Sequence, residues 1–240
     1  HYPLCMIILP NIEILDLAIY VDSTLVIADV HIGYEEALNK QGILVPRLQF
    51  DEMVKRMEKI FALLENRGIK RIVVNGDLKH EFGTISEQEW RNTLKFLDLL
   101  SNHCSEILLI KGNHDAILGP IAKKRHIKIL ENYISNQTLI THGNTIPNKD
   151  LLKDVSTIII GHEHSAVSLK GGPRVEQYKC FLKGRYKGKN LIVQPSFNII
   201  VEGTDILRDE ILSPFLQRNL DNFDVYVIED KVYEFGKLKY

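Results

Sequence analysis

The stretch SEILLIKGNHD, residues 105 to 115, sets an apolar run directly before four small or polar residues. The run has the composition of a buried strand, whereas Gly112, Asn113, His114 and Asp115 suit neither a strand nor a helix. Four further stretches repeat this design: TLVIADVH (24–31), IKRIVVNGD (69–77), NQTLITHG (136–143) and VSTIIIGHEH (155–164). The sequence therefore predicts five strands that end alike.

Two segments between these strands have helical periodicity. Residues 48–68 carry apolar side chains at helical spacing and stop at Gly68, and residues 86–103 open with Ser86 and Glu89 in the spacing of a capping box. Strands that alternate with helices are typical of a parallel sheet with helices on its faces. We therefore expect the five strand ends to meet along one edge of such a sheet, where ligand sites form in open α/β folds.

The chain changes character from about residue 165, where strands follow one another without helices. These are AVSL (166–169), YKCFLKG (178–184), NLIVQPSFNII (190–200) and a final hairpin over 223–238. They predict a second, more antiparallel sheet. The predicted fold is an α/β four-layer α/β/β/α sandwich, in which two mixed sheets are flanked by helices. We expect one domain over 1–240, with its core at 24–200.

The five strand ends carry side chains that bind hard or borderline divalent metals. Five of the nine histidines lie there. Each motif alone has an ordinary explanation as a turn, but five in this order, each after an apolar strand, favour a metal site. The candidate ligands are Asp29, His31, Asp77, Asn113, His114, His142, His162 and His164.

Composition excludes several classes of protein. The 240 residues are 45% hydrophobic and 25% charged, as in globular proteins, and no apolar run approaches the roughly 18 residues of a membrane span. Thirty basic residues against 31 acidic ones leave no global field that would attract nucleic acid or a membrane. Three distant cysteines fit reduced thiols, and the start of the sequence does not read as a signal peptide, so we expect a cytoplasmic location.

The series D-x-H, G-D, G-N-H-D, H-G and G-H-x-H resembles the five-motif signature of calcineurin-like metallophosphoesterases, over about residues 24–200. Within that superfamily the chain is most similar to small archaeal-type phosphoesterases related to the SbcD nuclease and to DNA-ligase-associated phosphoesterases. The closer resemblance lies in ADVHIGYEEALNKQGILVP (28–46), PSFN (195–198) and VEGTD (201–205).

This resemblance implies two divalent ions that share Asp77. One ion would be held by Asp29, His31, Asp77 and His164, and the other by Asp77, Asn113, His142 and His162. Two ions about 3.5 to 4 Å apart can hold a hydroxide between them as nucleophile. Oxygen and imidazole donors without thiolate favour Mn²⁺, Fe²⁺ or Zn²⁺, and we expect Mn²⁺. Two carboxylates and one hydroxide leave about one positive charge on such a site, which suits a phosphate ester.

His114 would stand just outside the metal ligands. In the family the matching histidine protonates the leaving oxygen or steadies the transition-state charge, which suits an imidazole because it titrates near neutral pH. Asp115 would either orient His114 or stabilise the turn. Gly112 would let the backbone turn sharply, and the glycines of NGD and IGH would make room for close approach to the site.

Positive charge gathers in two local tracts. Residues 170–190 contain seven Lys or Arg against one Glu, with Tyr178, Phe181 and Tyr186 between them, and AKKRHIK (122–128) follows the GNHD motif. Basic residues with aromatic ones can bind a nucleic-acid strand through phosphate pairing and base stacking. Lysines also guard exposed sheet edges, which gives the tract at 170–190 an ordinary structural explanation.

Three functions stay open from the sequence. The first is a phosphodiesterase acting on nucleic acid or nucleotides, and the second is a phosphomonoesterase acting on a small metabolite or phosphoprotein. The third is a scaffold subunit that works with a protein partner in DNA or RNA processing. Lys79 and His80 would touch substrate or form a plain loop, and residues 34–46 would form a lid or a packed helix.

Overall fold

The computed structural model describes residues 4–46, 48–80, 86–115, 118–171 and 174–239, and within these ranges it contains two β-sheets. The first sheet has seven described strands, in the order of the chain. The antiparallel part consists of β1 (Cys5–Leu9), β2 (Ile12–Leu15), β3 (Ala18–Val21) and β4 (Thr24–Ala28). The parallel part continues from β4 with β5 (Arg71–Asn75), β6 (Glu106–Ile110) and β7 (Lys128–Leu130).

The second sheet has nine described strands, and β10 lies in parallel between β9 and β13. Its strands are β8 (Asn132–Ser135), β9 (Thr138–Thr141), β10 (Thr157–Ile160), β11 (Ser165–Gly171), β12 (Arg174–Tyr186), β13 (Lys189–Val193), β14 (Thr204–Asp205), β15 (Asp224–Ile228) and β16 (Val232–Lys237). β11 and β12 form a long antiparallel hairpin. The predicted C-terminal hairpin is β15 and β16, which joins the sheet through β12.

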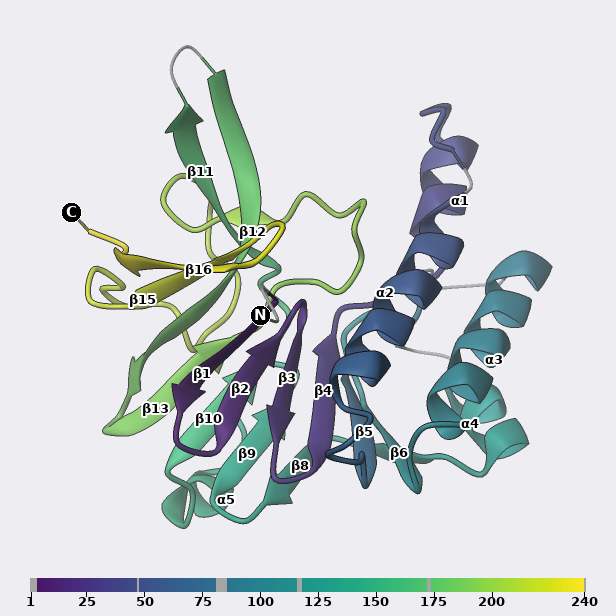
Figure 1. Cartoon of the computed structure of the whole chain (residues 1–240), viewed down its shortest axis with the longest axis horizontal. Coiled ribbons are helices and arrows are strands. Elements are labelled where there is room, and N and C mark those ends of the chain that lie inside the picture. The colour runs from purple at the N-terminus through teal and green to yellow at the C-terminus, as the bar shows by residue number, and fades with distance from the viewer. Residues whose placement is uncertain (1–3, 47, 81–85, 116–117, 172–173, 240) are drawn as a thin grey trace.

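The longer helices lie along the outer face of the first sheet (Figure 1). The described helices are α1 (Tyr34–Lys40), α2 (Gln49–Leu63), α3 (Glu87–Ser101), α4 (Gly119–Arg125) and α5 (Lys149–Lys153). Ser86 caps α3 by accepting from the N–H of Glu89, as predicted, while the Glu89 carboxylate accepts from the N–H of His80. None of the helices in the described ranges is both long and apolar enough to cross a membrane.

Residues of the second sheet alternate between two cores. Ile140, Ile159, Phe181 and Ile192 pack into the core that includes the first sheet, whereas their neighbours Leu139, Ile158, Ile160, Leu182 and Leu191 pack into a second core. This alternation follows from the two-residue repeat of a strand. Leu152 of α5 and irregular chain at 206–223 contribute to the second core. The predicted architecture of two mixed sheets flanked by helices is confirmed, with a thin outer layer on the second sheet.

The prediction that all five motif strands share one parallel sheet is wrong. β4, β5 and β6 belong to the first sheet, whereas β9 and β10 belong to the second. The chain crosses between the sheets at Glu131, the single residue between β7 and β8. β8 then pairs with β9 as an antiparallel hairpin, so that no helix returns the chain to the first sheet.

Two other segments differ from expectation. The strand predicted at 190–200 ends at Val193. The side chains of Gln194, Ser196 and Asn198 instead bind the main chain at the end of β4. The three N-terminal strands were not predicted, although residues 5–21 are rich in isoleucine and leucine.

Two elements rise beyond the carboxyl end of β4 on either side of it, as Figure 1 shows: α1 with its turn into α2, and the β11–β12 hairpin. Residues 34–40 form a helix, and reciprocal hydrogen bonds between Glu35 and Gln49 join α1 to α2. Asn39 in turn binds the main chain of Val45. The segment that was open between a lid and a helix is thus a hydrogen-bonded helix and turn.

The basic tract at 170–190 is largely engaged within the protein. Phe181 and Tyr186 are buried in the two cores, so neither ring is offered to a nucleic-acid base. Lys183 pairs with Asp224, and Lys189 donates to the carbonyl of Val155. These contacts favour the structural explanation of the tract over a nucleic-acid surface.

Lys179 of the same tract donates to the carbonyl of Val201, 2.8 Å away. Burial, with the nearby charge of Arg56, lowers the pKa of Lys179 to about 7. In the unfolded chain a lysine keeps its proton up to about pH 10.4, so folding must release that proton between these two values. Stability therefore rises with pH across this window.

We expect Lys179→Met to be more stable than the wild type near neutral pH, because it removes the cost of taking the proton from this lysine on folding. This advantage should shrink as the pH approaches about 10, where the wild-type lysine is neutral in both states. Urea denaturation of both proteins at several pH values measures the difference. Lys95→Met, an exposed lysine on α3, serves as control, and a difference that does not change with pH would contradict the assignment.

Candidate metal centre

The predicted ligands lie at the carboxyl ends of five strands, and the two sheets bring these ends together. In the first sheet, Asp29 and His31 follow β4, Asp77 follows β5 and Asn113 follows β6; in the second, His142 follows β9, and His162 and His164 follow β10. Three groups of potential ligands result in the described residues: two contain Asp77 and are described as the first and second clusters, and the third consists of His31, His80 and His114.

The first cluster consists of Asp29, His31, Asp77 and His164. The Nε2 atoms of His31 and His164 lie 3.1 Å apart. Nε2 of His31 is 3.8 Å from Oδ2 of Asp77, and Nε2 of His164 is 3.3 Å from Oδ1 of Asp29. Donor atoms about 2.1 Å from one ion lie roughly 3 Å from each other, so these separations fit a shared ion.

The second cluster consists of Asp77, His142 and His162, with Asn113 beside it. Nε2 of His142 lies 3.4 Å from Oδ2 of Asp77 and 3.0 Å from Oδ1 of Asn113. The ring centroids of His142 and His162 are 5.0 Å apart. Oδ2 of Asp77 therefore faces both clusters, while its Oδ1 accepts from the N–H of His114 at 2.8 Å.

The donor atoms fit a divalent cation. Oδ1 of Asp29 and Nδ1 of His31 are buried without a hydrogen-bond partner in the described part of the chain. Buried polar atoms rarely stay unpaired. The facing Nε2 atoms of His31 and His164 need a proton or a cation between them. Carboxylate, amide and imidazole donors suit Mn²⁺, Fe²⁺ or Zn²⁺.

The protonation of the imidazoles also suits cation binding. Burial and the charge of His164 lower the pKa of His31 to about 3, and burial and His142 lower the pKa of His162 to about 4. Burial acts in the same direction on His142, but the carboxylates of Asp77 and Asp29 raise its pKa to about 9. Neutral His31 and His162 thus offer lone pairs to a cation, whereas His142 would release its proton when it binds one.

Three motif glycines press against candidate ligands. A Cβ on Gly76 would lie 2.0 Å from Nδ1 of His142, and one on Gly161 would lie 2.7 Å from Oδ2 of Asp29. A Cβ on Gly112 would lie 2.1 Å from Oδ1 of Asp77. The chain does turn after Gly112, where the N–H of Asp115 donates to its carbonyl at 3.4 Å, but the backbone of Gly112 is outside the left-handed region, so close approach to Asp77 is the reason for glycine.

Most of the candidate ligands hold an unfavourable backbone conformation. Asp29, His31, Asp77, His162 and His164 all have positive φ, between 46° and 67°. Each such residue costs about 1 kcal/mol relative to an ordinary conformation. Strain of this kind persists where surrounding contacts over-determine the backbone, and it concentrates at functional sites.

His114 lies beside the first cluster, with its ring 5.1 Å from that of His31. Its Nδ1 is 3.0 Å from the carbonyl oxygen of His80. Because a carbonyl only accepts, Nδ1 carries a proton, and Nε2 is left as the atom that can exchange one. The ring of His80 stacks on that of His114 at 5.5 Å and meets Tyr34 edge-on at 4.7 Å. The rings of His31, His114 and His80 therefore lie next to one another, and His80 is outside both clusters that contain Asp77.

Asp115 and Lys79 support the main chain of the site. The Asp115 carboxylate accepts from the N–H groups of Gly112 and Leu78, which favours its turn-stabilising alternative. Burial, with the charge of Asp77, raises the pKa of Asp115 to about 6. Lys79 is fully buried, and its ammonium donates to the carbonyl of His114 at 3.2 Å, so it holds the loop at 112–115 through its main chain.

The sequence did not indicate that PSFN (195–198) supports the candidate ligands. It was noted only as part of the family resemblance. Ser196 donates to the carbonyl of Asp29 at 2.6 Å, and Asn198 donates to the carbonyls of Val30 and His31. This buried segment, which follows β13 of the second sheet, thus holds the loop that carries Asp29 and His31. Both of these residues have left-handed backbone. Uncharged polar residues directly after an apolar strand are the signal that could have indicated it.

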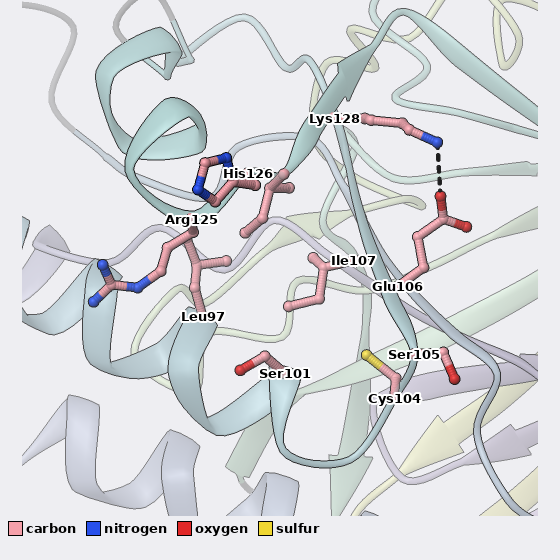
Figure 2. Close-up of a pocket in the computed structure, with 10 residues that line it drawn as sticks. Leu97, Ser101, Cys104, Ser105, Glu106, Ile107, Arg125, His126 and Lys128 are labelled. Atoms are coloured by element: carbon pink, nitrogen blue, oxygen red, sulfur yellow. Dashed lines mark hydrogen bonds and ion pairs between the residues drawn. The ribbon is translucent and has the colours of Figure 1, made fainter.

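A separate pocket of about 270 Å³ lies at the opposite, amino ends of β6 and β7 (Figure 2). Its charged groups are paired: Glu106 binds Arg71 and Lys128, and Arg125 binds Asp98. The AKKRHIK tract supplies Arg125 and Lys128 here. This part of the tract is therefore far from the metal centre and already neutralised.

Residues 23–203 match the model of the calcineurin-like phosphoesterase family. The chain belongs to this family, which confirms the resemblance inferred from the five motifs. It is therefore a metallophosphoesterase, a hydrolase that acts on phosphate esters. The closer resemblance to SbcD-related and DNA-ligase-associated phosphoesterases stays a prediction.

Among solved structures, the fold is similar to that of the nuclease MPE from Pseudomonas putida, at 18% identity and a TM-score of 0.65, over 93% of this chain and 94% of that one. Vps29 from Entamoeba histolytica, solved as a double mutant, matches at 16% identity over 88% of this chain and 95% of that chain. Its TM-score of 0.37 is too low to support a conclusion. None of the curated proteins compared with this chain matches it.

We expect Asp77→Ala to lose both Mn²⁺ binding and phosphoesterase activity, because Oδ2 of Asp77 faces both clusters. Titration of Mn²⁺ into the metal-free protein, together with hydrolysis of bis-p-nitrophenyl phosphate, measures both losses. Asp154→Ala, which removes an exposed carboxylate after α5, should behave as the wild type. Full activity of the purified Asp77→Ala protein would refute the site.

Gly112→Ala should also lose most activity, although it removes no ligand. The added methyl group would overlap Asp77, whose main-chain nitrogen is 2.3 Å from the Cβ position. Gly119→Ala is the matched control, since nothing lies within 4 Å of a Cβ there. Equal activity of the two variants would show that the packing against Asp77 is unimportant.

Proposed function

We propose that the protein is a Mn²⁺-dependent phosphodiesterase that hydrolyses nucleic acid or nucleotides. The observation that carries the proposal is the pair of donor clusters that share Oδ2 of Asp77. Two divalent ions bound there would supply Lewis acidity and a water-derived nucleophile at neutral pH. The ligands would be those predicted from the sequence, with Asp77 between the two ions.

The residues around the clusters have roles of their own in this proposal. His114 would deliver a proton from Nε2 to the leaving oxygen, since its Nδ1 is committed to the carbonyl of His80. His80, stacked on His114 and only half-buried, would contact the substrate next to the leaving group. Lys79 and Asp115 would keep the His114 loop in place through its main chain.

A phosphodiester suits the side chains around the first cluster better than a phosphomonoester does. The side chains that flank the first cluster are His80, His114 and Tyr34, and Lys79 is buried against the main chain. A phosphomonoester is a dianion, and binding it would need more positive charge than these side chains supply among the described residues. The similar fold of a nuclease supports the same choice.

We also propose that the protein is cytoplasmic. It is supported by the low number and wide spacing of the cysteines, Cys5, Cys104 and Cys180, which fit reduced thiols better than a disulfide framework. A protein partner in DNA or RNA processing stays a prediction from the sequence.

The deciding experiment is a substrate comparison with Mn²⁺. It uses bis-p-nitrophenyl phosphate, p-nitrophenyl phosphate, 2′,3′-cyclic nucleotides and single-stranded DNA. The proposal expects turnover of the diesters and of DNA. Turnover of the monoester alone would favour a phosphomonoesterase, and no turnover of any substrate would favour a scaffold subunit.

We expect His114→Ala to retain Mn²⁺ binding but to lose DNA cleavage by roughly 10²- to 10⁴-fold. Hydrolysis of bis-p-nitrophenyl phosphate should fall much less, because p-nitrophenolate leaves without a proton. Parallel rates on the two substrates, with Mn²⁺ titration as the binding measurement, test this split. His103→Ala, in which the lost ring stacks on Phe61 far from the site, is the control. Equal losses on both substrates would argue against proton transfer by His114.

A further inference from the structure

Glu163 lies between two candidate ligands in the GHEH motif, but its carboxylate binds a distant part of the chain. It accepts from the N–H of Leu212 at 3.1 Å and from that of Ser213 at 2.8 Å. The residue is only 1% exposed. A carboxylate is rarely buried to this extent unless its hydrogen bonds are satisfied, so these contacts fix both its own position and that of residues 212–213.

The segment at 212–213 also contacts the loop after β9, which carries the candidate ligand His142. Ser213 donates from Oγ to the carbonyl of Gly143 at 2.7 Å, and Gly143 directly follows His142. The loops also touch each other, since a Cβ on Gly143 would lie 2.9 Å from Cβ of Ile160. Residues 212–213 therefore join the HG loop to the GHEH loop.

The far end of the GHEH loop is held from the same region of the chain. The N–H of Thr204 donates to the carbonyl of His164 at 3.0 Å. A Cβ on Gly203 would lie 2.3 Å from that carbonyl oxygen, so the two main chains are in close contact. Both neighbours of Glu163, His162 and His164, have left-handed backbone, with φ of 67° and 51°. Such a loop needs external contacts to persist.

We propose that Glu163 is a positioning residue for the metal centre. Through residues 212–213, which lie beyond residue 203, where the family match ends, it would align the three histidines of the second sheet: His142, His162 and His164. Each of the three belongs to one of the two donor clusters. The inference rests on the proposed metal-dependent hydrolysis and names a determinant of its metal affinity.

Glu163→Gln tests this role with little change in shape. The amide oxygen can replace Oε2, which accepts from both N–H groups, but the NH₂ group then replaces Oε1, which accepts from the N–H of Leu212 at 3.3 Å, and two donors face each other there. The loops would lose alignment rather than a ligand. Residues that support metal ligands typically change metal affinity by about 10- to 100-fold when mutated.

The experiment titrates Mn²⁺ into metal-free wild type, Glu163→Gln and Glu210→Gln, with free Mn²⁺ followed by electron paramagnetic resonance. Glu210 is an exposed carboxylate on the same segment and serves as the matched control. Hydrolysis of bis-p-nitrophenyl phosphate is measured at each Mn²⁺ concentration. Half-saturation of Glu163→Gln should rise about ten-fold in both readouts, whereas kcat at saturating Mn²⁺ should stay within about three-fold of wild type. Glu210→Gln should match the wild type.

Ser213→Ala provides a second, milder variant that removes only the bond to Gly143. It should shift half-saturation in the same direction by a smaller factor, and it decides the question if Glu163→Gln does not fold. An unchanged half-saturation in the folded variants would overturn the inference, as would a loss of kcat that saturating Mn²⁺ does not restore. If the wild type itself binds no Mn²⁺, the proposed function fails, and this is seen in the first titration.

Discussion

The metal centre depends on one buried carboxylate placed where two sheets meet. Asp77 has left-handed backbone, its Oδ1 is fixed by the N–H of His114, and its Oδ2 faces histidines from both sheets. Glycine at position 112 is needed to admit it. The strain and the buried charge at this point are tolerated because hydrogen bonds from several segments hold the surrounding loops, a pattern common at functional sites.

Much of the fold follows from local pattern. The five motif strands and the two long helices appear where apolar periodicity and the Ser86 cap place them, because buried strands and amphipathic helices have distinct repeats. Assignment of strands to sheets did not follow, since it depends on the connection at Glu131, where no local signal separates a crossover from a turn into another sheet. Residues 5–21 form a meander of short apolar strands that was not recognised, although Pro10 and Asn11 mark its first turn.

The candidate ligands could be listed from the sequence because carboxylate, amide and imidazole residues recur at strand ends. Their supports could not be identified in the same way. Asn198 and Glu163 act through the main chain of distant loops, and a residue that binds a backbone group leaves no characteristic spacing in the sequence. Phe181 and Tyr186 show the opposite error, because aromatic residues in a basic tract resemble a stacking surface until their burial is known.

The crossing of the chain at Glu131 gives the site a mechanical property. Since donors to each cluster come from both layers of the sandwich, an ion held there fastens one layer to the other. Such an ion would bind only the folded arrangement of the two layers, so it would stabilise their contact as well as supply the proposed chemistry.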